Sequence, residues 1–513
     1  MAGEPRQRHD LVGVVTGGAP LVAGVDSSTQ STKVVLRRLD DGAPVAEARA
    51  PHPATEPPRS EQDPLAWWLA LVEAFGGLGS AVDDVVAISV SGQQHGLVVV
   101  GADDRPIRPA KLWNDTTSAP QADRLVASLG AERWAEACGV VPVAAITVTK
   151  LAWLAEHEPE SVDAIRRIML PHDYLTWRLT GSHVTDRGDA SGTGWWDAAG
   201  GAYVPELLAS AGVDRDLDRC LPQVVAPDES AGTITTEAAA ALGLSPGVIV
   251  GPGSGDNMAA SLGLGLRRGE LAMSLGTSGT VFAVADQPSR DPSGLVAGFA
   301  DANGAYLPLA CTLNATKVTD MIGTTLGLSH VELADLAVSP ETGAGAGGAV
   351  VVPWFDGERT PNLPAATGMI TGLRPGTGRA DLARAAHEGV LCNLLEAADA
   401  LAAVTPGLVV DGSAGGELRL VGGGARSVAY QQILADLHRG PVRIPADDEA
   451  PATGAAVQAA AVAVGDSIDD VTDRWGLRAG GTVIEPGAAA SSAAAEVRSR
   501  YRSAVGAAAE LAQ

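Results

Sequence analysis

The chain has 513 residues, and its formal net charge of −25 argues against a protein that binds the phosphate backbone of nucleic acids. Hydrophobic residues make up 46% of the sequence but aromatic residues only 4%, so we expect two or three domains with cores of Ala, Val and Leu. The widely spaced cysteines form no CxxC pair, which argues against a zinc site. No run approaches the ~20 apolar residues of a membrane span, so we expect a cytoplasmic protein without a membrane partner.

The N-terminus begins with a charged stretch that continues into the apolar run Leu11–Val25. This order loosely imitates a signal peptide. However, Thr16–Pro20 interrupts the run, and its second half leads directly into a polar loop. We therefore expect residues 1–20 to form an extension before the first strand.

The first predicted element is a β-hairpin made of Leu21–Val25 and Lys33–Leu36, with the polar turn Asp26–Thr32 at its tip. Asp26 ends the first strand, before a run of hydroxyl side chains. A carboxylate at this position could orient Mg²⁺ and phosphate, since this cation prefers oxygen ligands. It could equally be an Asx-turn residue that satisfies local N–H groups.

Further strands are predicted at Val85–Val90 and Leu97–Val100, and residues 118–180 are predicted to be mostly helical. The loop between these two strands contains Gln94 and His95, which could hydrogen-bond several sugar hydroxyls or could be structural. Two other polar loops, Trp113–Asp115 and Asp186–Asp189, are weaker candidates for the same kind of role.

Asp256 lies in the loop Gly251–Asn257, which follows the apolar run Val248–Val250. Small neighbours leave its carboxylate with little steric cover. Such a carboxylate can accept a hydroxyl proton during phosphoryl transfer. Turn chemistry explains the residue equally well.

The second half of the sequence opens like the first, with Glu270–Leu275 and Thr280–Ala285 flanking the hydroxyl-rich turn Ser274–Thr280. This weak repeat suggests a duplicated α/β domain with a boundary near residue 267. No Walker A motif occurs. The GxGxxG match at Gly343–Gly348 precedes a strand instead of following one, so it does not predict a dinucleotide site.

A helix is predicted over Asp381–Ala403, and the triple-glycine loop Gly422–Ser427 follows it between an apolar run and the helix Tyr430–Leu437. Consecutive glycines remove every Cβ, so a flat ligand or a phosphate can lie against bare backbone at a helix start. Together, the three polar loops suggest a nucleotide held between two domains. The segment after residue 467 is Ala-rich and is expected to be a peripheral helix.

The ordered motifs of the chain, from Val22 to Val464, resemble the FGGY family of carbohydrate kinases. The motifs that carry the resemblance are Ser91–Gly96, Lys111–Asp115, Met169–Tyr174, Asp189–Thr193, Gly255–Asn257, Ser274–Gly279, Gly357–Pro361 and Gly422–Ser427. The resemblance implies an α/β fold in which two actin-like (ribonuclease H-like) ATPase domains flank a nucleotide cleft. The segments it implies are an extension at 1–20, a sugar-binding domain at 21–266, an ATP-binding domain at 267–466 and a peripheral helical segment at 467–513.

The resemblance also implies roles for individual residues. Asp256 would be the catalytic proton acceptor, and Asp26 would be the catalytic carboxylate near the metal. The residues implied to bind the substrate are Gln94, His95, Trp113, Asp256 and Asn257. The residues implied to bind ATP are Thr29, Gln30, Thr32, Lys33, Gly276, Thr277, Ser278, Gly423, Gly424, Ala425 and Ser427.

Within the family, the motifs are most similar to those of members that phosphorylate D-xylulose with ATP and Mg²⁺. D-xylulose or a related ketose is therefore the expected substrate, and ADP an expected product. Three departures are Ser28 and Ser254 at positions where relatives often carry Gly, and Gln94 where many carry Met. Another pentulose or polyol is an alternative substrate, although the Gln94–His95 pair argues against glycerol. A non-catalytic, actin-like ATP-binding protein is an alternative of another class, and a homodimer is left open.

Overall fold

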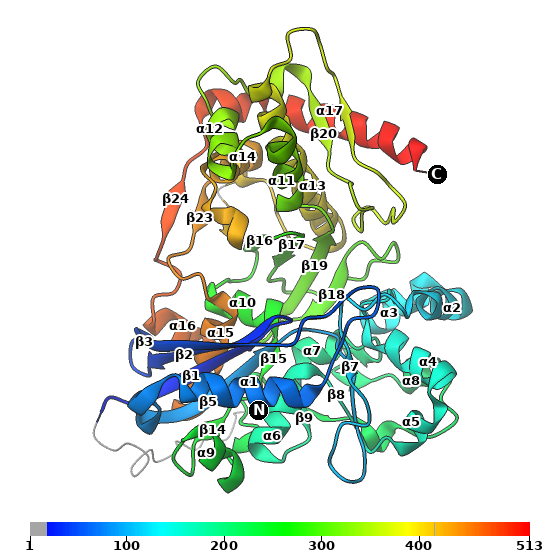
Figure 1. The fold of residues 1–513 in the computed structure, drawn as a ribbon, viewed down its shortest axis with the longest axis vertical. Coiled ribbons are helices and arrows are strands. Elements are labelled where there is room, and N and C mark those ends of the chain that lie inside the picture. Colours follow the sequence, from blue (N-terminus) through cyan, green and yellow to red (C-terminus); the bar gives the residue numbers. More distant parts are fainter. Residues whose placement is uncertain (1–17, 415, 513) are drawn as a thin grey trace.

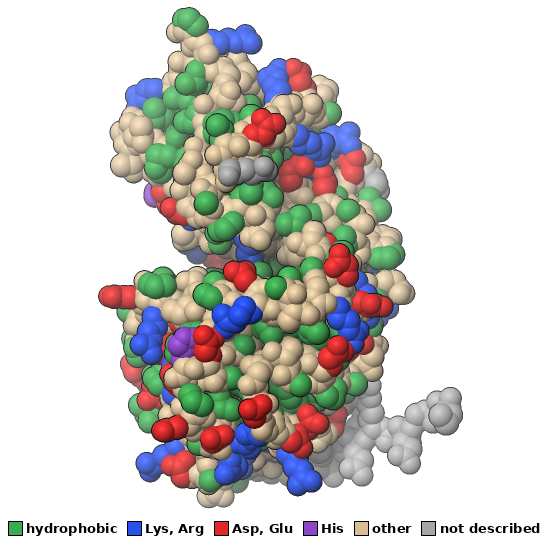
Figure 2. Space-filling model, turned by 90° about the vertical axis from the view of Figure 1, so that its right-hand side faces the viewer, with side chains coloured by type: hydrophobic (Ala, Val, Ile, Leu, Met, Phe, Trp, Pro, Cys, Tyr) green, Lys and Arg blue, Asp and Glu red, His purple; other side chains and the backbone are tan. Residues whose placement is uncertain are grey.

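The computed structural model describes residues 18–414 and 416–512 of the chain. These residues form two α/β lobes that follow one another along the long axis of the molecule (Figure 1). The space-filling view shows an indentation between the lobes at the left-hand edge, and acidic and basic side chains are interspersed across this face (Figure 2). Most of the expected extension at 1–20 lies outside the described residues.

The first lobe is built on a seven-stranded sheet with the order β13-β14-β5-β1-β2-β3, in which β15 also pairs with β5. The predicted hairpin is confirmed, because β1 and β2 pair antiparallel with Asp26 opposite Lys33. β1 runs parallel to β5, so both strands end at the same edge of the sheet. The strand bounds are β1 Leu21–Ser27, β2 Ser31–Arg38, β3 Pro44–Pro51, β5 Val85–Gly92, β13 Gly232–Thr233, β14 Ile249–Val250 and β15 Ser254–Gly255.

Both faces of this sheet are buried. Leu21, Ala23 and Val25 pack in the same core cluster as α1 (Pro64–Gly76), whereas Val22 packs with α15 (Ala450–Val464) on the other face. Alternate side chains of a strand point to opposite faces, so a strand between two helices must be apolar throughout. The helix α15 approaches so closely that a Cβ at Gly24 would lie 1.9 Å from the Ala452 carbonyl oxygen.

Smaller elements complete the first lobe, and helices dominate residues 118–180 as predicted. The helices are α2 Ala119–Leu129, α3 Ala131–Cys138, α4 Thr147–His157, α5 Pro159–Ala164, α6 Pro171–Thr180, α7 Arg187–Ser191, α8 Pro205–Ala209, α9 Thr236–Leu242 and α10 Asp256–Gly263. The short strands are β4 Glu61–Gln62, β6 Val98–Val100, β7 Ala110–Lys111, β8 Arg167–Met169, β9 Val184–Asp186, β10 Trp196–Asp197, β11 Ala202–Tyr203 and β12 Gln223–Val225.

The second lobe has its own seven-stranded sheet, with the order β18-β19-β17-β16-β22-β23-β24. It opens with the antiparallel pair β16–β17, which confirms that both halves begin with strand, turn and strand. The strands are β16 Leu271–Leu275, β17 Gly279–Ala283, β18 Ala297–Ala300, β19 Tyr306–Thr312, β22 Leu418–Val421, β23 Val442–Ile444 and β24 Thr482–Ile484. A separate pair is formed by β20 Val350–Val352 and β21 Met369–Thr371. The helices are α11 Thr316–Leu326, α12 His330–Ala337, α13 Arg379–Val404, α14 Val428–His438 and α17 Ala488–Leu511.

After β23 the chain returns to the first lobe. Residues 450–464, which lie in the segment expected for the second domain, form α15, and this helix packs on β1, β5 and α10 of the first lobe. α16 (Ile468–Arg474) also packs against α15. Shielding the second face of the first sheet is the physical reason for this return, since β1 and β5 would otherwise expose apolar side chains.

The C-terminal segment at 467–513 is also not purely helical. Its strand β24 pairs antiparallel with β23 and so extends the second sheet. α17 packs against α14 and α13, and its Tyr501 is buried in the core of the second lobe. Over the described part of the chain, no helix combines the length and apolar character needed to cross a membrane.

Candidate functional site

Strand ends bring the predicted carboxylates and sugar-binding residues to one edge of the first sheet. In the parallel pair, Asp26 of β1 lies beside Ser91 of β5, and Gln94 and His95 follow directly after β5. β15 pairs with the end of β5, with Gly255 beside Gly92, so Asp256 emerges at the same edge. Residues that are far apart in the sequence therefore meet where the three strands end.

Asp26 is half-buried, and its Oδ1 is shielded from solvent without a hydrogen-bond partner among residues 18–414 and 416–512. Burial, together with the negative charges of Asp256 and Glu449, raises the pKa of Asp26 to about 7. Such a carboxylate resists ionisation until a cation arrives. The sequence pattern alone left a turn role open, but an Asx turn would give this oxygen a backbone partner.

Asp256 is the first residue of α10, and burial raises its pKa to about 6. Its Oδ1 accepts hydrogen bonds from the Asn257 backbone N–H and from Asn257 Nδ2, both at 2.8 Å. Asn257 Nδ2 also donates to Gln94 Oε1 at 2.8 Å. One asparagine thus fixes the orientation of both the carboxylate and the glutamine.

Gln94 and His95 are buried, with exposed fractions of 5% and 9%. Gln94 Nε2 and His95 Nδ1 are enclosed and have no hydrogen-bond partner within the described ranges. Burial, together with the charges of Lys150 and Arg359, lowers the pKa of His95 to about 3, so the imidazole is neutral near pH 7. Buried polar atoms are normally paired, so these two atoms indicate a polar ligand.

Trp113 is 41% exposed, and its Nε1 donates to Thr29 Oγ1 at 3.0 Å. Thr29 Oγ1 donates in turn to Gln93 Oε1 at 3.1 Å. Thr29 is expected to bind ATP. Its side chain connects the first polar turn to the loop after β5, which contains Gln93. Its neighbour Gln30 is exposed at the tip of the turn.

The two remaining predicted residues of the first turn have side chains with internal partners. Thr32 is fully buried, and its hydroxyl lies 2.8 Å from His52 Nε2 and 3.4 Å from Ser27 Oγ. Lys33 forms an ion pair with Glu449 in the segment that leads into α15.

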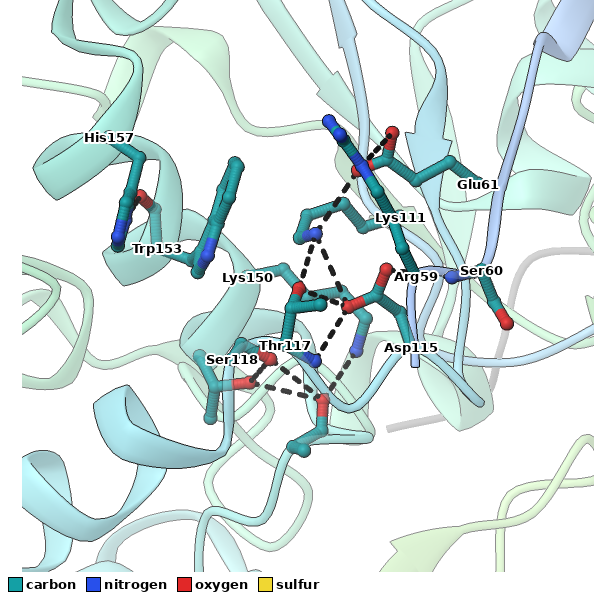
Figure 3. Close-up of polar contacts among 12 residues, drawn as sticks. Arg59, Ser60, Glu61, Lys111, Asp115, Thr117, Ser118, Lys150, Trp153 and His157 are labelled. Carbon is teal, nitrogen blue, oxygen red and sulfur yellow. Dashed lines mark hydrogen bonds and ion pairs between the residues drawn. The ribbon is translucent and has the colours of Figure 1, made fainter. Parts of the chain in front are cut away.

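The loop of Trp113 is held by a buried polar network that the sequence did not reveal (Figure 3). Lys111 Nζ is fully buried, 3.1 Å from Glu61 Oε1 and 3.2 Å from Asp115 Oδ1, and it lies 4.0 Å from the centre of the Trp153 ring. Asp115 Oδ2 accepts the Ser60 N–H at 2.9 Å. Glu61 and Trp153 lie far from Lys111 in the sequence, so the local Lys111–Asp115 motif could not indicate the whole network.

A second buried charge cluster explains the Asp186–Asp189 motif. His172 Nε2 lies 3.2 Å from carboxylate oxygens of both Asp173 and Asp186, and 3.5 Å from Asp189 Oδ2. Against the effect of burial, these carboxylates raise the pKa of His172 to about 9. A Cβ at Gly253, which has φ +80°, would lie 2.5 Å from His172 Nδ1. The cluster therefore supports the loop that precedes Asp256.

The second polar turn and the triple-glycine loop line one cavity of about 650 Å³ in the second lobe. We call it the glycine-lined cavity. Its volume lies in the range of small-molecule sites. The predicted residues that line it are Gly276, Thr277, Gly423, Gly424 and Ser427. Ser278 is not among the lining residues, and Ala425 is 4% exposed and belongs to the core of this lobe.

Helix residues that the sequence analysis missed form the other walls of the glycine-lined cavity. α11 begins against the second turn, where the Ala315 and Thr316 N–H groups donate to the Thr277 and Gly276 carbonyls, each at 3.0 Å. The other lining residues are Thr316, Thr319, Asp320, His330, Val331, Leu333, Ala334, Asp335, His387, Arg426, Val428 and Tyr430. The polar residues at the start of α11 could have indicated this wall from the sequence. The residues of α12 and α13 could not, because these helices reach the cavity only through the tertiary fold.

Comparison with known proteins gives a consistent result. The N-terminal domain model of the FGGY family of carbohydrate kinases matches residues 21–263, and the C-terminal domain model matches residues 271–463. A xylulose kinase of Streptomyces coelicolor is 49% identical over 90% of this chain and 92% of its own length. A xylulose kinase of Escherichia coli is 35% identical over 81% and 84%. The crystal structure of xylulose kinase from Bifidobacterium adolescentis superposes with a TM-score of 0.79 at 37% identity, covering 94% of this chain and 99% of that one.

Proposed function

The chain belongs to the FGGY family of carbohydrate kinases, with the expected pair of actin-like α/β domains, and we propose that it transfers the γ-phosphoryl group of ATP to the 5-hydroxyl of D-xylulose. The observation that carries this proposal is the meeting of Asp26, Asp256 and the unsatisfied Gln94–His95 pair at one sheet edge. The relatives named above support the choice of ketose.

Asp256 is the proposed general base. Its pKa of about 6 lets it be ionised near pH 7 while it still retains useful basicity. Asn257 holds Oδ1, so the second oxygen is available to accept the proton of the 5-hydroxyl. Gln94 Nε2 and neutral His95 bind other sugar oxygens, which satisfies the atoms that the protein leaves unpaired. Orientation of the hydroxyl supplies most of the rate in such a transfer.

Asp26 is the residue that fits a Mg²⁺ ion carried by the nucleotide. Its enclosed, unpartnered oxygen and raised pKa suit an oxygen-seeking cation. Within the described residues, no cluster of three or more His, Cys, Asp or Glu side chains could hold a metal. When bound, the ion offsets negative charge on the phosphates. Asp26 would hold the ion through its waters.

The glycine-lined cavity is the proposed adenosine site. Gly423 lines the cavity and has no atom of the described residues within 4 Å of the position that a Cβ would occupy, so a side chain there would fill open space at this wall. A Cβ at Gly422, by contrast, would lie 2.6 Å from the Leu275 carbonyl oxygen, and Gly422 has φ +87°.

We therefore expect Gly423→Leu to raise the KM for ATP by at least about 10-fold, since a lost or blocked apolar contact surface costs about 1–3 kcal/mol. The thermal midpoint should stay near the wild-type value. Gly422→Ala serves as the matched control, because it should lower the midpoint through strain and backbone overlap. An unchanged KM for ATP in Gly423→Leu would place the nucleotide elsewhere.

The pH dependence of kcat/KM tests the base directly, because this parameter reports groups of the free enzyme. Asp256 must be ionised, and burial raises its pKa to about 6, with Asp26 at about 7 beside it. We expect kcat/KM for the ketose to fall as pH drops from about 7.5 to 5. The two carboxyls titrate together, so the decrease of kcat/KM at low pH reports both of them. A flat profile down to pH 5 would contradict their raised pKa values.

The activity itself is tested by sugar-dependent ADP release with Mg-ATP. D-xylulose, D-ribulose, L-ribulose, L-xylulose and glycerol are compared at matched concentrations. A clear preference for D-xylulose supports the proposal, whereas a preference for another sugar keeps the mechanism and changes the substrate. Nucleotide binding without any sugar-stimulated release would favour the non-catalytic alternative. A cytoplasmic location and a homodimer remain predictions from the sequence.

A further inference from the structure

An arginine of the Gly357–Pro361 motif has no role in the mechanism above. Arg359 lies between β20 and β21 of the second lobe. We propose that its guanidinium binds the ketose at the end remote from the phosphorylated hydroxyl, donating to the carbonyl oxygen O2 and the neighbouring hydroxyl O1. This inference rests on the proposed function and adds a contact from the second lobe to a substrate held by the first.

The backbone around Arg359 is rigidly held. The neighbouring Glu358 is 1% exposed, and its Oε1 accepts the Leu313 N–H at 2.6 Å and the Arg359 N–H at 2.8 Å. Its Oε2 accepts from Asn314 Nδ2 and Asn393 Nδ2, both at 3.1 Å. On the other side, Thr360 Oγ1 donates to the Cys311 carbonyl oxygen at 2.7 Å. A buried carboxylate with four donors fixes the position of the residue that follows it.

The C-terminal helix supports this arrangement. Tyr501 of α17 donates to Asn393 Oδ1 at 3.0 Å, and Trp354 Nε1 donates to the same oxygen at 3.3 Å. Asn393 is thereby oriented so that its amide group reaches Glu358. The segment that was expected to be peripheral thus reaches the loop of Arg359 through one asparagine.

The loop of Arg359 lies near the part of the second lobe that reaches the sugar side of the site. Thr360 is hydrogen-bonded to β19, β19 pairs with β18, and the Phe299 ring of β18 lies 5.3 Å from the His95 ring. The charge of Arg359 also acts on the His95 imidazole and on the buried Lys150 amine, both in the first lobe. It also acts on the Cys311 thiol, which the charge of Asp256 affects in the opposite direction. Arg359 does not line the glycine-lined cavity. Its position therefore favours a contact with the sugar over one with adenosine.

No carboxylate pairs with this guanidinium anywhere in residues 18–414 and 416–512, and it makes no side-chain hydrogen bond there. His95 is neutral, and Lys150 Nζ is committed to the Ala144 and Ala145 carbonyls. A half-buried cation with five unused donors calls for oxygen acceptors. The planar fork matches a carbonyl and an adjacent hydroxyl, which an open-chain 2-ketose presents at its first two carbons.

The test compares Arg359→Met, Arg359→Lys and the wild type on D-xylulose and on 1-deoxy-D-xylulose, which lacks O1. Arg374→Met is the control, because Arg374 is an exposed arginine of the same lobe, in the segment between β21 and α13. In Arg359→Met, the KM for D-xylulose should rise about 10- to 100-fold, as expected for lost hydrogen bonds to a charged group. The KM for ATP should change less than about twofold. Arg359→Lys keeps the charge but loses the planar guanidinium, so its KM for D-xylulose should lie between those of the wild type and Arg359→Met.

The deoxy sugar separates a direct contact from a structural effect. Wild type should bind 1-deoxy-D-xylulose more weakly than D-xylulose, and this difference should disappear in Arg359→Met, as in a double-mutant cycle. An equal penalty for the missing O1 in both proteins would overturn the contact. A rise in the KM for ATP alone would also overturn it. If wild type phosphorylates no ketose, the proposed function fails first and this inference fails with it.

Discussion

Asp256→Asn is expected to lower kcat for the ketose by about 10²- to 10⁴-fold, the range that a positioned general base contributes. The substitution preserves shape, and the new amide oxygen can still accept both hydrogen bonds from Asn257. What disappears is the ability to accept the proton of the attacking hydroxyl. Affinity for ATP should be nearly unchanged, because Asp256 lies outside the glycine-lined cavity.

The measurement is single-turnover transfer from Mg-ATP to D-xylulose, with nucleotide binding followed by calorimetry. Asp123→Asn provides a control, since Asp123 is an exposed residue of α2. Near-normal turnover in Asp256→Asn would remove Asp256 from the role of base. A combined loss of turnover and nucleotide affinity would indicate a folding defect instead.

The elements that local patterns specify were predicted well. The two strand–turn–strand units at β1–β2 and β16–β17 follow from apolar runs that flank polar turns. The return of α15 to the first sheet could not be predicted in the same way. α15 is buried all around, so its sequence does not indicate which sheet it covers.

The residues of the site also fall into those that the local sequence reveals and those that it does not. Asp26, Asp256 and the glycines stand out because each follows a strand in a short polar loop. By contrast, Lys111 pairs with Glu61, which lies far away in the sequence. The charge of Arg359 acts on His95 of the other lobe, so neither residue stands out from its local sequence. Strand alternation also explains Thr32, whose position in β2 turns its hydroxyl inward to His52.

Asp26→Asn is expected to separate activity from stability. An acidic residue that orients a metal through water typically contributes about 10- to 100-fold to metal affinity or activity, so kcat/KM should fall by that factor. Raising the Mg²⁺ concentration should recover part of the loss, because weaker ion binding is then offset by mass action. A variant with full activity at low Mg²⁺ would exclude Asp26 from the metal site.

The same substitution should stabilise the ligand-free protein at pH 8. Burial raises the pKa of folded Asp26 from 3.8 to about 7, so between these pH values the folded state binds more protons than the unfolded state. Raising the pH through this window therefore lowers the free energy of unfolding, and the loss is complete above about pH 7. Asn avoids this cost, so the variant should gain about 1–2 kcal/mol at pH 8 and nothing near pH 4. Denaturant unfolding at both pH values measures the difference, and an equal effect at pH 4 and pH 8 would show that the gain does not come from the buried charge.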